Sequence, residues 1–221
     1  MKAMILAAGR GERMRPLTDK LPKPLIEVGN KPLIEWHIEK LASLGFEEII
    51  VNIAHLGYMI PEALGDGSKW GVKLIYSDEQ KSEALESAGA IVKALPLLGN
   101  DTFLVVNGDI RCDYEFDKNF DLKDKLAHII LVPNPKHNPN GDFALKEGIV
   151  YNEGEKRYTF SGIGYYSPKL FYSLKLQKAP LAPVLRKAVE ERSIGGSLYE
   201  GIWHDVGTVE RLYEVRTLAV L

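Results

Sequence analysis

Charged side chains in two parts of this sequence could do chemistry on phosphate groups. The cations Arg10, Arg13 and Lys23 lie in one glycine- and proline-rich stretch, and the carboxylates Asp109 and Asp205 each stand close to a glycine. Lysine and arginine neutralise phosphate oxygens. One or two carboxylates, completed by phosphate oxygens, form the ligand set that Mg²⁺ favours. The pattern therefore indicates a phosphorylated substrate and a sparse, open magnesium site at Asp109 and Asp205.

A glycine-containing segment follows the first apolar run of the chain. Gly9 and Gly11 would let backbone N–H groups approach phosphate oxygens, although a tight turn explains such a pair equally well. A dinucleotide-binding fingerprint needs a third glycine where Met14 stands, and a P-loop needs a Gly-Lys-Ser/Thr sequence that this segment lacks. What remains is a long irregular loop, and such loops inside compact domains are often functional.

Each charged residue also has a plainer explanation. Pro22 and Pro24 would hold Lys23 in a rigid segment that suits a phosphate-binding cation, but a surface lysine in a proline turn has the same sequence. Asp109 could belong to an ordinary Gly-Asp turn. Asp205 could be a turn or cap residue before a helix that begins near residue 208.

The elements that must position these residues alternate between strands and helices. Apolar runs predict strands at residues 2–7, 48–53, 72–76 and 102–106. Helical spacing predicts helices at residues 33–44, 56–64 and 87–95, the last of them stopping near Pro96. This alternation implies parallel strands. Ligands bind beyond the carboxyl ends of such strands, so the site is expected in the loops that follow Ala7, Ile53, Tyr76 and Val106.

The second half of the chain has a different pattern. A fifth strand is predicted at residues 127–132, and a loop at 134–141. Short antiparallel strands are expected at residues 143–145, 149–151, 158–160 and 163–166, and helices at 183–191 and 208–221. The predicted fold is α/β: a Rossmann-like, mostly parallel mixed sheet flanked by helices, with a small antiparallel part in the second half.

Composition excludes several classes of protein. The chain has 221 residues, 28 Lys+Arg and 30 Asp+Glu, and its net charge of −2 argues against a general nucleic-acid binder. No segment approaches the roughly 20 apolar residues of a membrane span. The lone Cys112 cannot form a disulfide within the chain and is expected to pack in the core. We therefore expect a cytoplasmic protein with one domain over residues 1–221.

The order of the motifs resembles that of the sugar-1-phosphate nucleotidyltransferase family. The resemblance covers essentially the whole chain, and the first motif together with the lysine that follows is specific to these proteins. The residues that carry it are Leu6–Thr18, Pro22–Pro24, Asn107–Asp109 and Trp203–Thr208.

The resemblance implies a reaction and a set of residues. A sugar 1-phosphate would attack the α-phosphorus of a nucleoside triphosphate, with Mg²⁺ as cofactor and Arg13, Lys23 and Asp109 as catalytic residues. Asp109 and Asp205 would bind the metal. The residues implied for nucleotide binding are Leu6, Ala8, Gly9, Gly11, Arg13, Lys23, Ala88 and Gly89. The residues implied for binding the sugar 1-phosphate are Asn107, Asp142, Ser161 and Gly162.

The substrates are less sharply specified than the reaction. The resemblance favours UTP and N-acetylmuramate 1-phosphate, in the recycling of cell-wall material. Mannose 1-phosphate with GTP, or glucose 1-phosphate with a uridine or thymidine triphosphate, remains an alternative. A non-catalytic binder of sugar nucleotides and a dinucleotide oxidoreductase are alternatives outside the class. The chain is expected to be a monomer or a homodimer.

Overall fold

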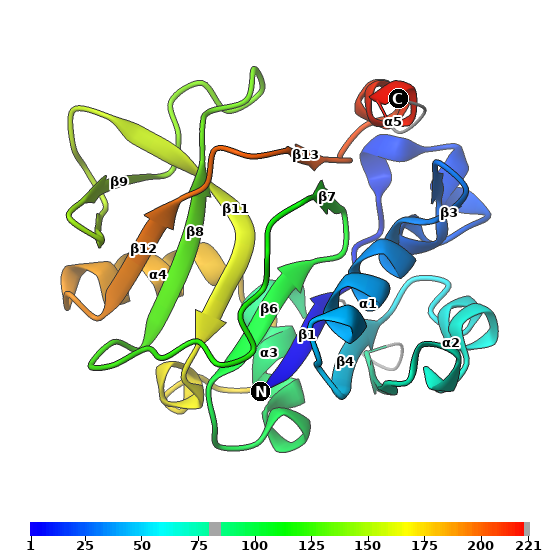
Figure 1. The fold of residues 1–221 in the computed structure, drawn as a ribbon, viewed down its shortest axis with the longest axis horizontal. Helices are drawn as coiled ribbons and strands as arrows, with labels where there is room; N and C mark the ends of the chain where they lie inside the picture. Colours follow the sequence, from blue (N-terminus) through cyan, green and yellow to red (C-terminus); the bar gives the residue numbers. More distant parts are fainter. Residues whose placement is uncertain (80–84, 219–221) are drawn as a thin grey trace.

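The computed structural model describes residues 1–79 and 85–218, in which a nine-stranded mixed sheet has helices on both faces (Figure 1). The strand order is β5-β4-β1-β6-β11-β8-β12-β10-β9. The expected α/β class and mixed sheet are confirmed. Among the described residues, no helix is both long and apolar enough to cross a membrane. The helices are α1 (Leu33–Ser43), α2 (Met59–Leu64), α3 (Glu86–Leu98), α4 (Leu181–Glu190) and α5 (Val209–Leu218).

Parallel strands form one half of the sheet. In spatial order they are β5 (Lys73–Asp78), β4 (Glu48–Ile53), β1 (Lys2–Leu6) and β6 (Phe103–Asn107). These are the strands predicted in the first half of the chain, with small shifts at their ends. Leu6 pairs with Asn52 on one side and Asn107 on the other, so these residues form one row near the carboxyl edge. The strand order reverses between β1 and β6, which is where ligands bind in open α/β sheets.

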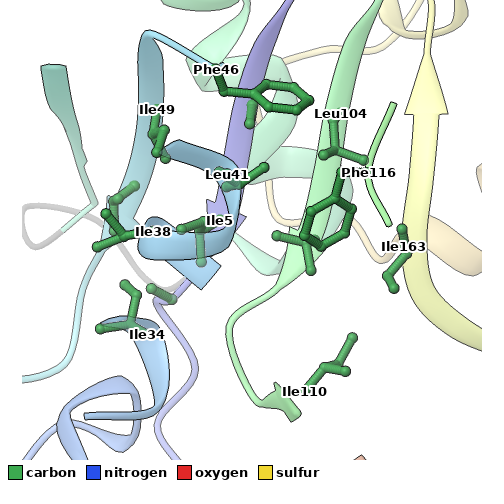
Figure 2. Close-up of a cluster of buried hydrophobic side chains, with 14 of the residues drawn as sticks. Ile5, Ile34, Ile38, Leu41, Phe46, Ile49, Leu104, Ile110, Phe116 and Ile163 are labelled. Atoms are coloured by element: carbon green, nitrogen blue, oxygen red, sulfur yellow. The ribbon is translucent and has the colours of Figure 1, made fainter. Parts of the chain in front are cut away.

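Apolar packing on both faces holds this edge in place. Ile38 of α1 packs with Ile5 and Ile49 on one face of the sheet (Figure 2). Met4 and Ile50, the neighbours of those two strand residues, belong to the cluster on the opposite face, under α3 and α4. Successive side chains of a strand point to opposite faces. Both faces are covered, so the parallel strands are continuous apolar runs.

The second half of the sheet is largely antiparallel. One correction concerns residues 157–166, where two strands were expected and the structure has a single strand, β11. Its pairing with β8 shifts register between Phe160 and Ile163, and Gly162 has φ +79° at that point. Residues 161 and 162 interrupt the apolar pattern, so the sequence predicts two strands where the structure has one. The strands here are β8 (Ala127–Val132), β9 (Phe143–Lys146), β10 (Ile149–Tyr151), β11 (Arg157–Tyr166) and β12 (Ile194–Leu198).

A second correction concerns α3, which runs past Pro96 to Leu98 instead of stopping near the proline. Proline weakens the helix at this point by removing one N–H from the hydrogen-bond ladder, but the last turn continues and Leu98 is buried in the core.

Several short elements had no detectable period in the sequence. The glycine-rich β12 is one of them. The others are β2 (Glu27–Val28), β3 (Lys31–Pro32), β7 (Ile110–Cys112) and β13 (Trp203–Asp205), together with the 3₁₀ turns Glu12–Met14, Leu17–Asp19, Lys23–Leu25, Ser68–Trp70 and Pro168–Phe171.

Candidate active site

A cavity of about 910 Å³ opens at the carboxyl ends of the parallel strands. It lies where the reversal of strand order predicts a ligand site. Many of the residues singled out in the sequence line it together: Leu6, Ala8, Gly9, Gly11, Arg13, Lys23, Asn107 and Asp109.

The glycine loop has one glycine that the fold requires and one that it does not. Gly11 has φ +63°, and a Cβ there would lie 2.7 Å from Thr18 Cγ2. The buried Thr18 hydroxyl donates to Gly11 O at 2.8 Å, which fixes the loop from below. Around Gly9, by contrast, a Cβ would have nothing within 4 Å. The backbone at Gly9 is therefore open to the cavity, as close approach of a phosphate requires.

Lys23 is held as the flanking prolines suggested. It begins a 3₁₀ turn, Lys23–Leu25, after Pro22 in extended conformation. Its ammonium donates to Asp109 Oδ2 at 2.6 Å, and only 11% of its side chain is exposed. A charge-assisted bond of this length is among the stronger kinds of hydrogen bond in proteins. The pair places a cation and a carboxylate side by side at the cavity.

Asp109 reaches this position because Gly108 lets the chain press against β1. The Gly108 N–H donates to Leu6 O at 2.9 Å, and a Cβ on Gly108 would lie 2.8 Å from the same oxygen. Glycine is therefore needed at position 108 because a Cβ would collide with Leu6 O, and not because the backbone has a positive φ. The turn after β6 lies directly beside the start of the glycine loop.

A short antiparallel ribbon brings Asp205 close to Asp109. Strands β7 and β13 pair Ile110 with Asp205, and Val206 N–H donates to Asp109 O at 2.7 Å. The Asp205 carboxylate is held by Arg211, whose Nη1 lies 2.6 Å from Oδ1 and 2.5 Å from Oδ2. His137 Nε2 lies 3.2 Å from the same carboxylate.

The first and last motifs of the sequence also meet at Gly207, which lines the cavity. A Cβ at Gly207 would lie 3.3 Å from Arg13 Nη2, so the guanidinium of the first motif rests against the last motif. The hydroxyl of Thr208 accepts from Arg211 N–H at 3.3 Å and caps α5, as the sequence suggested for that helix.

The donor set suits a metal that substrate helps to bind. Within residues 1–79 and 85–218, no group of three or more His, Cys, Asp or Glu side chains could hold a metal ion. Asp109, in the turn before β7, and Asp205, in β13, offer two carboxylates, each already next to a cation. Mg²⁺ commonly takes one or two protein carboxylates and completes its shell with water and phosphate oxygens. The residues present fit such an ion.

Ala88 and Gly89, predicted to bind nucleotide, are buried at the start of α3. Both of their N–H groups donate to Ala179 O, at 2.9 and 3.1 Å. A Cβ on Gly89 would overlap Gln177 O. The glycine is thus explained by packing of the segment before α4. Glu86 and Ser87, which the sequence analysis did not select, line the cavity instead.

The residues of the second half that were predicted to bind the sugar mostly make hydrogen bonds or close contacts within the protein. The Ser161 hydroxyl, 1% exposed, donates to Ile130 O at 2.7 Å and accepts from Ile163 N–H at 3.1 Å. Asp142 accepts from Phe160 N–H at 2.8 Å. Gly162 does approach the cavity, because a Cβ there would lie 2.5 Å from Nδ2 of the lining residue Asn107. Their contacts with a sugar stay predictions.

Two buried polar residues that line the cavity were missed. Asn52 is the second-last residue of β4, and Glu79 directly follows β5; the exposed fractions of the two residues are 3% and 1%. A signal was available, since both lie at the carboxyl ends of strands whose end loops were expected to form the site. Arg211 and Lys178 carried no comparable signal. Cys112 is buried, and burial raises the pKa of its thiol, as a packing role implies.

The chain belongs to the nucleotidyl transferase family, whose sequence model matches residues 2–219. The resemblance seen in the motifs is thereby confirmed. A relative from Neisseria meningitidis serogroup B, an N-acetylmuramate alpha-1-phosphate uridylyltransferase, is 51% identical over 228 residues, which cover 99% of this chain and 98% of that protein.

More distant relatives share part of their length or only the fold. A UTP–glucose-1-phosphate uridylyltransferase from Synechocystis is 41% identical over 148 residues, which span 62% of this chain and 38% of that protein. The crystal structure of an assigned glucose-1-phosphate thymidylyltransferase from Bacillus anthracis superimposes with a TM-score of 0.87 at 24% identity. That alignment covers 99% of this chain and 95% of the other.

Proposed function

We propose that this protein transfers the uridylyl group of UTP to N-acetylmuramate α-1-phosphate, releasing pyrophosphate. The observation that carries the proposal is the Lys23–Asp109 pair at 2.6 Å in the cavity beside the glycine loop. The Neisseria meningitidis relative, which matches over nearly all of both chains, supports the choice of substrates. Magnesium dependence and a cytoplasmic role in peptidoglycan recycling are parts of the same proposal.

The reaction needs no nucleophile from the protein. An oxygen of the sugar 1-phosphate attacks the α-phosphorus of UTP and forms the new P–O bond. The bond from the α-phosphorus to the bridging oxygen breaks, and pyrophosphate leaves with that electron pair. The buried Cys112 has no part in this displacement. Catalysis then consists of holding two anions in line and neutralising the charge that they bring together.

The lining residues divide this work. The open backbone at Gly9 would receive the phosphates of UTP, with Arg13 on the triphosphate. Lys23 would neutralise charge on the α-phosphate, because its ammonium is fixed at the cavity by a rigid turn. Asp109 and Asp205 would hold Mg²⁺, which supplies further neutralisation of phosphate oxygens when bound.

A matrix of substrates tests the proposal. UTP, GTP, CTP and dTTP would each be combined with N-acetylmuramate, glucose and mannose 1-phosphates in Mg²⁺ buffer, and pyrophosphate and the nucleotide sugar would be measured. The proposal expects the highest kcat/KM for UTP with N-acetylmuramate α-1-phosphate. A higher value for another pair would replace these substrates, and nucleotide binding without turnover in any combination would favour a non-catalytic binder.

A further inference from the structure

Two buried side chains that line the cavity link the glycine loop to the start of α3. Asn52 Oδ1 accepts from the N–H of Ala7, where the glycine loop leaves β1, at 2.7 Å. Asn52 Nδ2 donates to Glu79 Oε1 at 2.9 Å. Glu79 Oε2 in turn accepts from the N–H of Leu85 at 3.0 Å. We call Asn52 and Glu79, with these three bonds, the polar relay.

Backbone pairing in the sheet holds both residues of the relay in place. Asn52 pairs in register with Leu6 of β1, the residue before Ala7. The Glu79 N–H donates to Ile53 O at 2.8 Å, which ties it to the end of β4. Burial in a low dielectric makes each bond of such a network stronger, and makes each one expensive to leave unmade. A displacement at one end therefore reaches the other.

The two ends of the relay border different parts of the cavity. Ala7 precedes the open backbone at Gly9, where the phosphates of a nucleotide are proposed to bind. Leu85 precedes Glu86 and Ser87, which line the cavity at the beginning of α3. A nucleoside triphosphate that filled the cavity would touch both borders at once. Its affinity would depend on the spacing between them.

We propose that Asn52 and Glu79 are positioning residues that set the glycine loop and the start of α3 at the spacing that a bound nucleoside triphosphate requires. This inference rests on the proposed function for the identity of the ligand. It gives the two side chains a role in nucleotide affinity, without contact with the reacting atoms. It also accounts for a buried amide among the apolar residues at the carboxyl end of β4.

Exchanging the two functional groups tests the relay. Asn52→Asp alone would face Glu79 with a second carboxylate. Glu79→Gln alone leaves one amide between two N–H donors. In the double variant N52D/E79Q the amide at position 79 can donate to the carboxylate at 52, which still accepts from Ala7 N–H, and its carbonyl can accept from Leu85 N–H. The double variant thus rebuilds all three bonds with the net charge unchanged.

The measurement is the equilibrium affinity for UTP in Mg²⁺ buffer by calorimetric titration, together with KM and kcat. We expect each single variant to weaken UTP affinity about tenfold or more, since a buried polar group loses its partner, with KM changed more than kcat. The double variant should return to within about threefold of the parent protein. Asn152→Asp is the matched control, because Asn152 donates to Arg186 O and does not line the cavity.

Other outcomes overturn the inference. Single variants that lose thermal stability but keep their UTP affinity would make the relay a structural feature only. If the loss of UTP-binding free energy in the double variant equals the sum of the losses in the two single variants, the bonds are not coupled. If a single variant does not fold, the double variant decides by its affinity alone. Binding is measured without a sugar phosphate, so absence of transfer would count against the proposed function and leave the relay to be judged separately.

Discussion

Lys23 and Asp109 lie 86 positions apart in the chain, yet the lysine ammonium donates to the aspartate carboxylate at 2.6 Å across the cavity. The bond joins the loop after β1 to the turn after β6. It holds the ammonium in place before a phosphate arrives, so little reorganisation is left for the reaction itself. Preorganised charge of this kind is commonly the largest single contribution to catalysis.

Gly9 and Gly11 offer a test of phosphate binding by backbone. Gly9→Ala meets open space in the structure, so its melting temperature should stay within about 1 °C, while UTP affinity falls about tenfold because the methyl group stands where phosphate approaches. Gly11→Ala is the comparison: its positive φ and its contact with Thr18 predict a loss of about 1–2 kcal/mol in the free energy of unfolding. Normal UTP affinity in Gly9→Ala would contradict the placement of the phosphates.

Gly162 is predicted to be needed for the position of Asn107. Gly162→Ala should destabilise the protein by about 2–4 kcal/mol, because a left-handed φ is combined with a Cβ that lies 2.5 Å from Asn107 Nδ2. Gly148→Ala isolates the strain, since it has φ +78° and no contact closer than 3.9 Å. Urea unfolding measures both. Equal losses in the two variants would show that the Asn107 contact is unimportant.

Asp205 should matter for the metal more than for the nucleotide. Asp205→Asn removes one of two candidate carboxylate ligands, so we expect the Mg²⁺ concentration for half-maximal activity to rise about tenfold or more. The substitution also removes the charge that pairs with Arg211, so some stability is lost as well and the Mg²⁺ requirement is the deciding measurement. Metal removal by chelation should abolish turnover in the parent protein. The exposed Asp124→Asn is a suitable control. An unchanged Mg²⁺ requirement in Asp205→Asn would remove this residue from the metal site.

We predict that the buried His37 makes the folded protein less stable in acid. Burial lowers the pKa of its imidazole from 6.5 to about 4, and Nε2 lacks a partner in the described structure. The unfolded chain takes up the proton first, so stability is intact above pH 6.5 and falls as the pH drops toward 4. Between pH 7 and pH 5 the loss should be about 2 kcal/mol. His37→Leu should show a shallower decline in urea unfolding, and equal slopes would contradict this origin.

Much of this site could be predicted because its residues follow buried strands. Parallel strands bring their carboxyl ends to one edge, so Gly9, Lys23 and Asp109 were expected together, and they do line one cavity. The closeness of Asp205 to Asp109 could not be inferred, because it depends on a ribbon of two three-residue strands, β7–β13, too short to show a period.

Long-range packing accounts for what remained hidden. Gly89 was predicted to bind nucleotide, and nothing in the sequence indicated that its N–H is bonded to Ala179 O, a contact between residues far apart in the chain. Asn52 and Glu79 became partners only through the register of β1, β4 and β5. A sequence pattern indicates which residues end a strand. It does not indicate which carbonyl or carboxylate from elsewhere will meet them.

The most direct test of the account is pyrophosphate release from UTP, with and without N-acetylmuramate α-1-phosphate, in the parent protein and in Lys23→Ala. We expect release in the parent protein only when UTP, the sugar phosphate and Mg²⁺ are all present. We expect kcat/KM in Lys23→Ala to be lower by about 100-fold or more, with the fold retained. Parent and variant rates that agree within a factor of two would contradict the central role of Lys23 in this cavity.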